Sequence, residues 1–270
     1  MADISMADIP RTARLLVIAG SDSSAGAGLQ ADLKTAQAFG VYAQTAVTAL
    51  TVQDTEEVHS VHLVPPEIVH GQIVAALNDI GADAIKIGML GSGRIASAVA
   101  DVLENIDLPL VLDPVLASSS GATLLDELGV AVLKTRLIPR ALLVTPNLPE
   151  AETLTGIRPR SPHTLRNAAQ AFMMLGAKNI FFKGGHGTGD TVKDVLVGRV
   201  GETVFESPRQ QTPHTHGTGC TLSTAIASGV ALGLGLEAAV ARAHRFVQNA
   251  ILSAPGLGRG HGPLNHRHEG

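Results

Sequence analysis

The chain has 270 residues, of which 45% are hydrophobic and 16% are charged, and it contains 29 glycines, one Tyr and no Trp. Its 20 basic and 24 acidic residues leave a net charge of −4, so neither a basic surface nor aromatic stacking platforms point to nucleic acid as a partner. This apolar, glycine-rich composition also excludes a disordered or fibrous chain and is typical of helices packed on a sheet.

The cysteine content and the N-terminus indicate where the protein works. Cys220 is the only cysteine, so no intramolecular disulfide can form, and a reducing, cytoplasmic setting is expected. Residues 1–14 contain acidic side chains and no apolar run, which predicts a flexible tail rather than a secretory signal. No stretch approaches the roughly 20 apolar residues of a membrane span, so a membrane is not an expected partner.

Strand-like and helix-like segments alternate through the first half of the chain. The run LLVIAG at residues 15–20 is apolar, ends in glycine and predicts a buried parallel strand. Segment 28–40 carries apolar residues at Leu29, Leu33 and Ala36, the spacing of one helix face. Further strands are expected over residues 41–51, 84–87 and 109–112, and further helices over residues 65–81 and 94–104.

The second half continues this alternation. Strands are expected over residues 141–144, 179–183, 194–197 and 203–206, with helices around Glu150 and Leu165 and over residues 222–232 and 236–251. Because no linker-like change of composition occurs, residues 15–266 are expected to form one α/β domain with a mostly parallel sheet. The last segment, from Arg259 to Gly270, carries His261, His266 and His268 and is expected to be a solvated tail, since no carboxylate or cysteine stands nearby to complete a metal site.

Ligands of parallel α/β sheets bind at the carboxyl ends of the strands, and several segments there carry chemistry. The sequence HGTGCT at residues 216–221 leads into a helix of small residues. Its glycines allow close approach of the backbone, and the free N–H groups and dipole of the helix start favour an anion. The segment therefore predicts a phosphate site, although a glycine-rich helix start that only turns tightly is the simpler alternative.

Two further segments predict the charged groups of such a site. In FFKGGH, residues 181–186, an apolar strand delivers Lys183, which can reach a phosphoryl group or can be a surface lysine at a turn. Asn147 and Glu150 stand three apart at a helix start, where they can hold Mg²⁺ and its waters or form a capping box, and the two roles are compatible. Asp113 follows another apolar strand and suits the same site.

Segment 20–32 contains the pattern G-x-G-x-x-A after a strand, which resembles a dinucleotide fingerprint. That fingerprint needs its first glycine directly at the strand's end and an acidic residue about 20 positions later, so a nicotinamide dehydrogenase is not expected. Asp32 lies on the same inward helix stripe as Leu29 and Ala36. A carboxylate there needs a polar partner, which could be a backbone amide or a substrate hydroxyl.

Seven blocks in this order resemble the hydroxymethylpyrimidine/phosphomethylpyrimidine kinases, a branch of the ribokinase-like superfamily. The blocks are GSDSSAGAGLQADLK, TALTVQDT, IKIGMLGS, DPVLASSSGATLLD, TPNLPEAE, KGGH and HGTGCT, and the resemblance runs from about Leu15 to His266. It implies a three-layer α/β/α domain, usually a homodimer, that uses ATP and Mg²⁺ to phosphorylate 4-amino-5-hydroxymethyl-2-methylpyrimidine and its monophosphate for thiamine diphosphate biosynthesis.

The resemblance also implies roles for individual residues. Gln53 would read the pyrimidine ring, because an amide can both donate and accept hydrogen bonds. The implied substrate residues are Gly20, Asp32, Gln53, Met89 and Val115. The implied nucleotide-binding residues are Asn147, Glu150, Lys183, Gly217, Thr218 and Gly219. Asp113 and Glu150 would bind the metal. The implied catalytic residues are Lys183, Gly219 and Cys220.

Cys220 distinguishes this chain from the sugar kinases of the superfamily, which have Gly-x-Gly-Asp here, with the aspartate as base. A thiol at a helix N-terminus should lose its proton more easily than a free thiol, so Cys220 could take the proton of the substrate hydroxyl. Alternatively Cys220 is only part of the anion-binding backbone, since phosphoryl transfer depends mostly on positioning and charge neutralisation. Ala25 stands where the family often has glycine, which restricts the substrate loop.

Two other functions stay open at this point. A vitamin B6 kinase on the same fold would phosphorylate pyridoxal or pyridoxine better than the pyrimidine. A non-catalytic sensor of a pyrimidine is indicated by the missing aspartate, but it would not need Lys183, Asn147 and Glu150. The residues also leave open whether one or both phosphorylation steps are catalysed.

Overall fold

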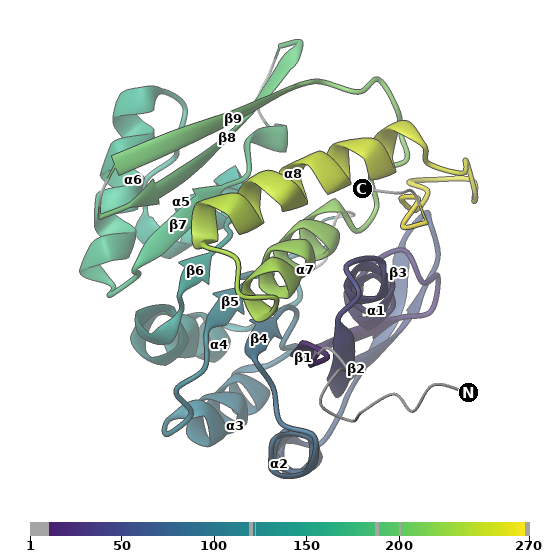
Figure 1. The fold of residues 1–270 in the computed structure, drawn as a ribbon, viewed down its shortest axis with the longest axis vertical. Coiled ribbons are helices and arrows are strands. Elements are labelled where there is room, and N and C mark those ends of the chain that lie inside the picture. The colour runs from purple at the N-terminus through teal and green to yellow at the C-terminus, as the bar shows by residue number, and fades with distance from the viewer. Residues whose placement is uncertain (1–10, 119–120, 122, 187–188, 200, 268–270) are drawn as a thin grey trace, which may run out of the picture.

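The computed structural model describes residues 11–118, 121, 123–186, 189–199 and 201–267. These residues contain a nine-stranded sheet with the strand order β3-β2-β1-β4-β5-β6-β7-β8-β9 (Figure 1). Most of the expected N-terminal tail, residues 1–10, lies outside the described residues, and Arg14 already belongs to the first strand. The α/β class expected from the alternation is confirmed.

Six strands at the centre of the sheet run parallel to one another, in the spatial order β2, β1, β4, β5, β6 and β7. The strands β3, β8 and β9 are antiparallel to their neighbours. The strands are β1 (Arg14–Asp22), β2 (Tyr42–Gln53), β3 (Val58–Leu63), β4 (Ala84–Ile87), β5 (Leu110–Leu112), β6 (Leu143–Val144), β7 (Asn179–Phe182), β8 (Thr191–Gly198) and β9 (Gly201–Pro208). Parallel pairing brings the carboxyl ends of the central strands to one edge of the sheet, where a ligand site is expected.

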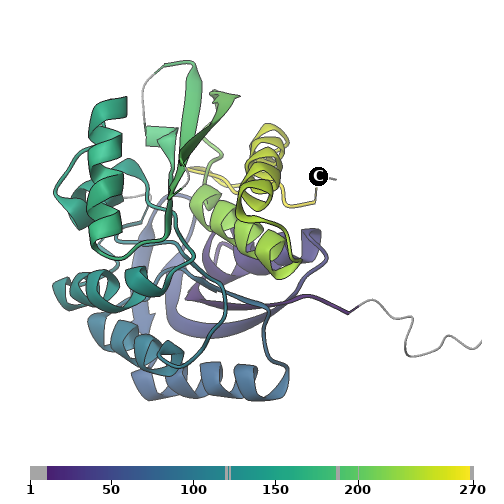
Figure 2. The same cartoon turned by 60° about the vertical axis from the view of Figure 1, so that its left-hand side comes forward.

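Helices cover both faces of the sheet (Figures 1 and 2). One layer contains α1 (Gly28–Ala38), α7 (Thr218–Ala231) and α8 (Leu236–Leu252). The other contains α2 (Pro66–Asp79), α3 (Gly93–Leu103), α4 (Glu127–Val132), α5 (Leu148–Thr155) and α6 (Pro162–Met174). The expected three-layer α/β/α arrangement is therefore confirmed.

The apolar run of β1 shows why the sequence folds into three layers. Its successive side chains point to opposite faces, so Leu16 and Ile18 pack in the core under α2 to α6, and Leu15 and Val17 pack in the core under α1, α7 and α8. All four are fully buried. A strand covered on both sides needs apolar residues at every position, which explains its lack of polar alternation.

Some local expectations were wrong. Leu33 was expected to face inward from α1 but is 40% exposed, because the buried face of that helix runs through Leu29, Asp32 and Ala36 instead. The short strand β3 and the helix α4 were not predicted. In β3 all residues after Val58 are exposed, so no buried face marks it in the sequence.

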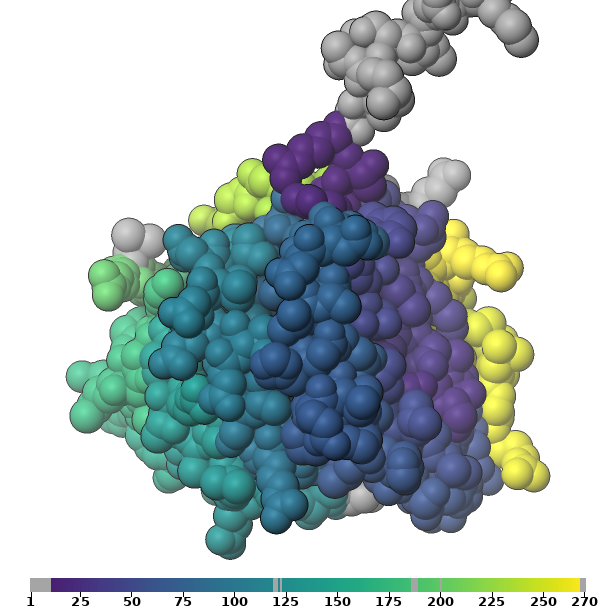
Figure 3. Space-filling model, turned by 90° about the horizontal axis from the view of Figure 1, so that it is seen from below, coloured from purple at the N-terminus to yellow at the C-terminus, as the bar shows by residue number. Residues whose placement is uncertain are grey.

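The C-terminal segment is not the solvated tail that the sequence predicts. His266 is buried and its Nε2 lies 2.9 Å from the hydroxyl of Thr221 on α7. The backbone N–H of His261 donates to the carbonyl of Thr55 in the β2–β3 turn at 2.7 Å. Figure 3 shows this segment, in yellow, beside the purple-blue part of the chain that includes β2 and β3. The segment therefore ties the β2–β3 turn to α7.

Candidate active site

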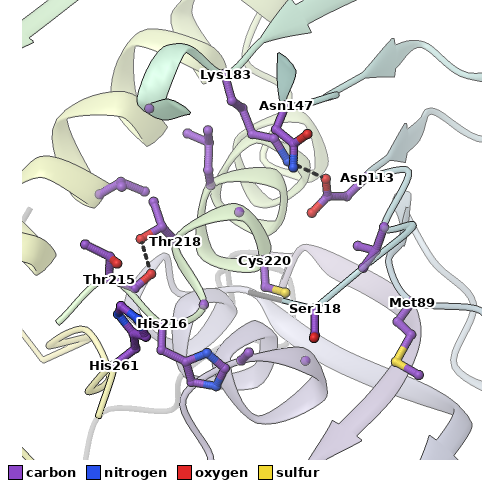
Figure 4. Close-up of a pocket in the computed structure, with 18 of the residues that line it drawn as sticks. Met89, Asp113, Ser118, Asn147, Lys183, Thr215, His216, Thr218, Cys220 and His261 are labelled. Atoms are coloured by element: carbon purple, nitrogen blue, oxygen red, sulfur yellow. Dashed lines mark hydrogen bonds and ion pairs between the residues drawn. The ribbon is translucent and has the colours of Figure 1, made fainter. Parts of the chain in front are cut away.

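A cavity of about 540 Å³ opens at the carboxyl ends of the parallel strands. The loops that follow β1, β4, β5, β6 and β7 line it together with the first turn of α7. In Figure 4, Lys183, Asn147 and Asp113 gather at one end, and Cys220 lies between this group and Ser118. Segments that are distant in sequence therefore meet where the fold class predicts a ligand site.

The charged end of the cavity is built around Lys183. Its Nζ lies 2.7 Å from Oδ1 of Asp113 and 3.7 Å from Oε2 of Glu150. Burial opposes the charge of the ammonium, but the two carboxylates outweigh it and raise the pKa of Lys183. Lys183 is thus a fixed cation at the cavity wall and not a surface lysine at a turn.

Glu150 and Asn147 form the capping box at the start of α5. The backbone N–H of Asn147 donates to Glu150 at 2.7 Å, and the backbone N–H of Glu150 donates to Oδ1 of Asn147 at 2.8 Å. Both residues also line the cavity, so the capping role does not remove them from the site. Burial raises the pKa of Glu150 to about 7, against the opposing charge of Lys183.

The glycine loop shapes the middle of the cavity. Gly217 adopts a left-handed conformation with φ of +82° and precedes the first residue of α7, Thr218. A Cβ at Gly219 would lie 3.3 Å from Nζ of Lys183, so the first turn of α7 stands next to this ammonium. The N–H of Thr218 donates to the carbonyl of Thr215 at 3.2 Å. The other N–H groups of this helix start, the helix dipole and a lysine therefore converge where a phosphoryl group would be held.

Cys220 lies in the same turn, and the expected fall in its pKa was wrong. Burial raises the pKa of this thiol to about 11, with Lys86 lowering it and the carboxylates of Asp32 and Asp113 raising it. The backbone N–H of Gly28 also lowers it, but by less than burial raises it. The position at a helix N-terminus is as expected, while the surrounding protein outweighs its effect.

The residues expected to meet a ring also belong to this cavity, and of these Met89 lies well away from Lys183 (Figure 4). Gly20, Gln53, Met89 and Val115 all line it. The backbone of Gln53 is fixed by Ser23, whose hydroxyl accepts from its N–H at 2.8 Å and donates to its carbonyl at 2.7 Å. These residues supply one amide and apolar neighbours, a lining suited to a small polar ring.

Asp22 organises the loop after β1, although sequence reasoning gave it no role. Its carboxylate accepts backbone N–H bonds from Ser24 and Ala27, each at 2.8 Å, and lies 2.8 Å from Nε2 of His216. Burial raises its pKa, but the bonds from His216, Ser24 and Ala27 outweigh this and lower it. Since the carboxylate can only accept, Nε2 of His216 carries the hydrogen and joins this loop to the glycine loop. Ala25, in the same loop, has a positive φ of 60°.

Asp32 does not line the cavity, in contrast to the other substrate residues expected from the sequence. Its partners are the ammonium of Lys86 at 2.8 Å and the hydroxyl of Thr224 at 2.6 Å, and not a backbone amide. Lys86, which does line the cavity, was missed. The signal was present in the sequence, because a lysine inside the buried strand AIKI needs a partner.

A family model described as phosphomethylpyrimidine kinase matches residues 22–265 of the chain. The chain belongs to the phosphomethylpyrimidine kinase family. Over 260 aligned residues it is 44% identical to the hydroxymethylpyrimidine/phosphomethylpyrimidine kinase of Haemophilus influenzae, and the alignment covers 94% of this chain and 96% of that protein. Over 254 aligned residues it is 48% identical to the thiamine biosynthesis bifunctional protein ThiED of Geobacter sulfurreducens. That alignment covers 93% of this chain but only 52%, about half, of the length of that relative.

Among solved structures, the ADP complex of Bacillus subtilis pyridoxal kinase superposes with a TM-score of 0.87 at 34% sequence identity, covering 95% of this chain and 98% of that one. The expected family and ribokinase-like fold are therefore confirmed. No helix within the described ranges is long and apolar enough to cross a membrane.

Several residues of the phosphomethylpyrimidine kinase fold that line this cavity were missed by sequence reasoning. They come from elements that are far apart in the chain, and they are Val192, Pro208, Val247, Gln248, Ile251 and His261. Nearby, Oδ1 of Asp194 accepts from the N–H of Gly184 at 2.7 Å, and its other oxygen lies 3.6 Å from Nε2 of His244. Asp194 thus fixes the glycine that follows Lys183.

Replacing His266 by alanine is expected to lower the free energy of unfolding by about 2–3 kcal/mol, because it empties a buried site and leaves the hydroxyl of Thr221 without this partner. Urea unfolding followed by circular dichroism measures the change. The control is His70→Ala on α2, where the side chain is exposed. Equal unfolding midpoints for His266→Ala and His70→Ala would contradict the prediction and would mean that the contact of His266 with Thr221 does not stabilise the fold.

Proposed function

We propose that the chain transfers the γ-phosphoryl group of ATP to the hydroxymethyl oxygen of 4-amino-5-hydroxymethyl-2-methylpyrimidine and then to the phosphate of the monophosphate, for thiamine diphosphate biosynthesis. Membership of the phosphomethylpyrimidine kinase family gives the reaction class. The observation that carries the proposal is that Gln53, Lys183 and the first turn of α7 all line one cavity.

The protein's own contribution to this reaction is positioning and charge neutralisation. N–H groups of the first turn of α7 would hold the transferring phosphoryl oxygens, and Lys183 beside Gly219 would neutralise their charge. Gln53 would orient the ring so that its hydroxymethyl oxygen faces the phosphorus. The ADP complex of the Bacillus subtilis relative supports ATP as the donor.

Mg²⁺ is the metal that this donor set suits, since Mg²⁺ is commonly bound by one or two carboxylates together with substrate phosphates. Asp113 and Glu150 line the cavity beside Lys183 and would hold it. Waters and the substrate phosphates would complete the coordination of the ion. The ion would add positive charge at the phosphoryl oxygens.

The rival substrate is pyridoxal, because a pyridoxal kinase shares 34% identity and the fold. A coupled ADP-release assay with ATP and Mg²⁺ separates the two when hydroxymethylpyrimidine, its monophosphate and pyridoxal are offered in parallel. We expect turnover of the pyrimidine and of its monophosphate. A large preference for pyridoxal would overturn the substrate assignment, and ligand binding without ADP formation would favour a sensor.

Gln53→Ala is expected to raise KM for the pyrimidine by the equivalent of roughly 1–3 kcal/mol, because the polar groups of the ring lose a partner. The Michaelis constant for ATP serves as the internal control and should stay unchanged, since the side-chain amide of Gln53 lies 3.3 Å from Nε2 of His216 and is not among the partners of Lys183. Steady-state kinetics with each substrate varied in turn measures both constants. An unchanged KM for the pyrimidine would place ring recognition elsewhere.

We also propose a cytoplasmic homodimer. The single cysteine favours a reducing compartment. The β2–β3 hairpin exposes large apolar side chains, at Leu50, Val52, Val61 and Leu63, which a partner copy would cover. Light scattering on the purified protein measures the oligomeric state, and a monomer at micromolar concentration would contradict the proposal.

A further inference from the structure

Lys86 on β4 and Asp32 on α1 form an ion pair inside the domain. The two charged atoms lie 2.8 Å apart, and both side chains have 0% exposed surface. The other carboxylate oxygen accepts from the hydroxyl of Thr224 at 2.6 Å. A buried pair adds little stability, because taking two charges out of water costs about as much as their attraction returns. Of the two residues, Lys86 also lines the cavity, and this position points to a role in the reaction.

The ammonium of Lys86 is held at the wall of the cavity. β4 lies between β1 and β5 at the centre of the sheet, and Lys86 is one of the residues that line the cavity. Gly88 leaves room for the ammonium, since a Cβ there would lie 2.8 Å from Nζ. Of its three donors, the groups of the described residues use one, toward Asp32. Lys86 is thus held in place with donors to spare.

The pair stands next to Cys220. Cys220 and Thr224 are four residues apart on α7 and so share one face of the helix, one turn from each other. Because Thr224 bonds to Asp32, the thiol lies one turn from the buried pair. The charged groups that act on the thiol are Lys86, Asp32 and Asp113, together with Lys183. Burial raises the pKa of Cys220, and the ammonium of Lys86 is the largest of the influences that oppose this rise.

We propose that Lys86 is a positioning residue that acts through Cys220, stabilising the thiolate that takes the proton of the acceptor hydroxyl, while Asp32 holds the ammonium and moderates its charge. This inference rests on the proposed kinase function. The hydroxyl proton passes to the sulfur, and the oxygen bonds to the γ-phosphorus of ATP. The bond from that phosphorus to the bridging oxygen breaks, and its electron pair leaves on ADP. The thiol then returns its proton to solvent.

The test is the alkylation of Cys220 by iodoacetamide between pH 7 and pH 9, without nucleotide. Cys220 is the only cysteine, so the rate reports its thiolate alone. We expect Lys86→Met to slow alkylation about 10-fold and Asp32→Asn to speed it about 10-fold, since one variant removes the stabilising cation and the other removes its neutralising partner. Lys178→Met, which removes an exposed lysine, should leave the rate unchanged.

The opposite signs distinguish the electrostatic role from a structural one. A structural role predicts that both variants loosen the site and move the rate in the same direction, and that result, or no change in either, would overturn the proposal. If Lys86→Met does not fold, Lys86→Gln takes its place in the comparison, because only opposite signs at Lys86 and Asp32 decide. Folding of each variant is checked by a cooperative thermal transition, because an unfolded chain would also react faster.

Kinetics provide the second readout. At each pH between 7 and 9, we expect kcat of Lys86→Met to be about 10-fold lower than kcat of the wild type, with KM for ATP unchanged. If Lys86→Met slows alkylation and Asp32→Asn speeds it, but the wild type does not phosphorylate the pyrimidine, the proposed function is wrong and the influence of Lys86 on Cys220 stands. If the wild type phosphorylates the pyrimidine but the two variants do not shift the alkylation rate in opposite directions, the proposed function stands and the role of Lys86 is wrong.

Discussion

Replacing Lys183 by alanine is expected to lower kcat about 10²- to 10³-fold with either pyrimidine acceptor, the scale of losing one charge-stabilising donor. The ammonium lies 2.7 Å from Asp113 and next to the first turn of α7, where the transferring phosphoryl group would sit. Without it, the phosphoryl group would meet the carboxylates of Asp113 and Glu150 with one cation fewer. The loss should therefore appear in kcat for both acceptors.

The control for this prediction is Lys193→Ala. Lys193 lies on β8 with a 62% exposed side chain and pairs with Glu206, so its removal takes away a surface charge of the same kind. Steady-state rates of ADP release compare the two variants with the wild type at saturating ATP. If Lys183→Ala kept the kcat of Lys193→Ala, the lysine would have no part in the phosphate site.

The sequence alone predicted the charged end of the site well, because each of its residues follows a recognisable strand. Asp113 and Lys183 come directly after two apolar strands and Asn147 comes three residues after the strand between them, and these strands are parallel neighbours. Parallel pairing brings such positions together at one edge of the sheet, so no long-range information was needed. The glycine loop was equally recognisable, since its residues are contiguous in the chain.

The parts that were missed depend on contacts between distant segments. Lys86 and Asp32 are 54 residues apart, and only the packing of α1 against β1 and α7, with β4 next to β1, brings them together. The C-terminal segment shows no apolar periodicity, and His266 is buried by its contact with Thr221. The pKa of Cys220 was misjudged because the helix dipole can be read from the sequence, whereas the extent of burial cannot.

Gly217→Ala is expected to lower kcat/KM for the pyrimidine by about 10²-fold or more. Gly217 has φ of +82°, and a Cβ there would overlap the carbonyl oxygen of Gly26 in the loop after β1. That atom belongs to the backbone, so it cannot move aside as a flexible side chain does. The two loops would have to separate at the point where His216 bonds to Asp22, and a displacement of about 1 Å can cost 10²-fold in rate.

Gly233→Ala separates this clash from simple backbone strain. Gly233 has nearly the same φ, +84°, but a Cβ there would meet nothing within 4 Å. Both variants place an alanine in the left-handed region, at a cost of about 1–2 kcal/mol in stability. Only Gly217→Ala forces the substrate loop away from the phosphate loop, so only it should lose activity beyond its loss of stability. Equal kcat/KM in the two variants would mean that contact between these loops does not position the reacting groups.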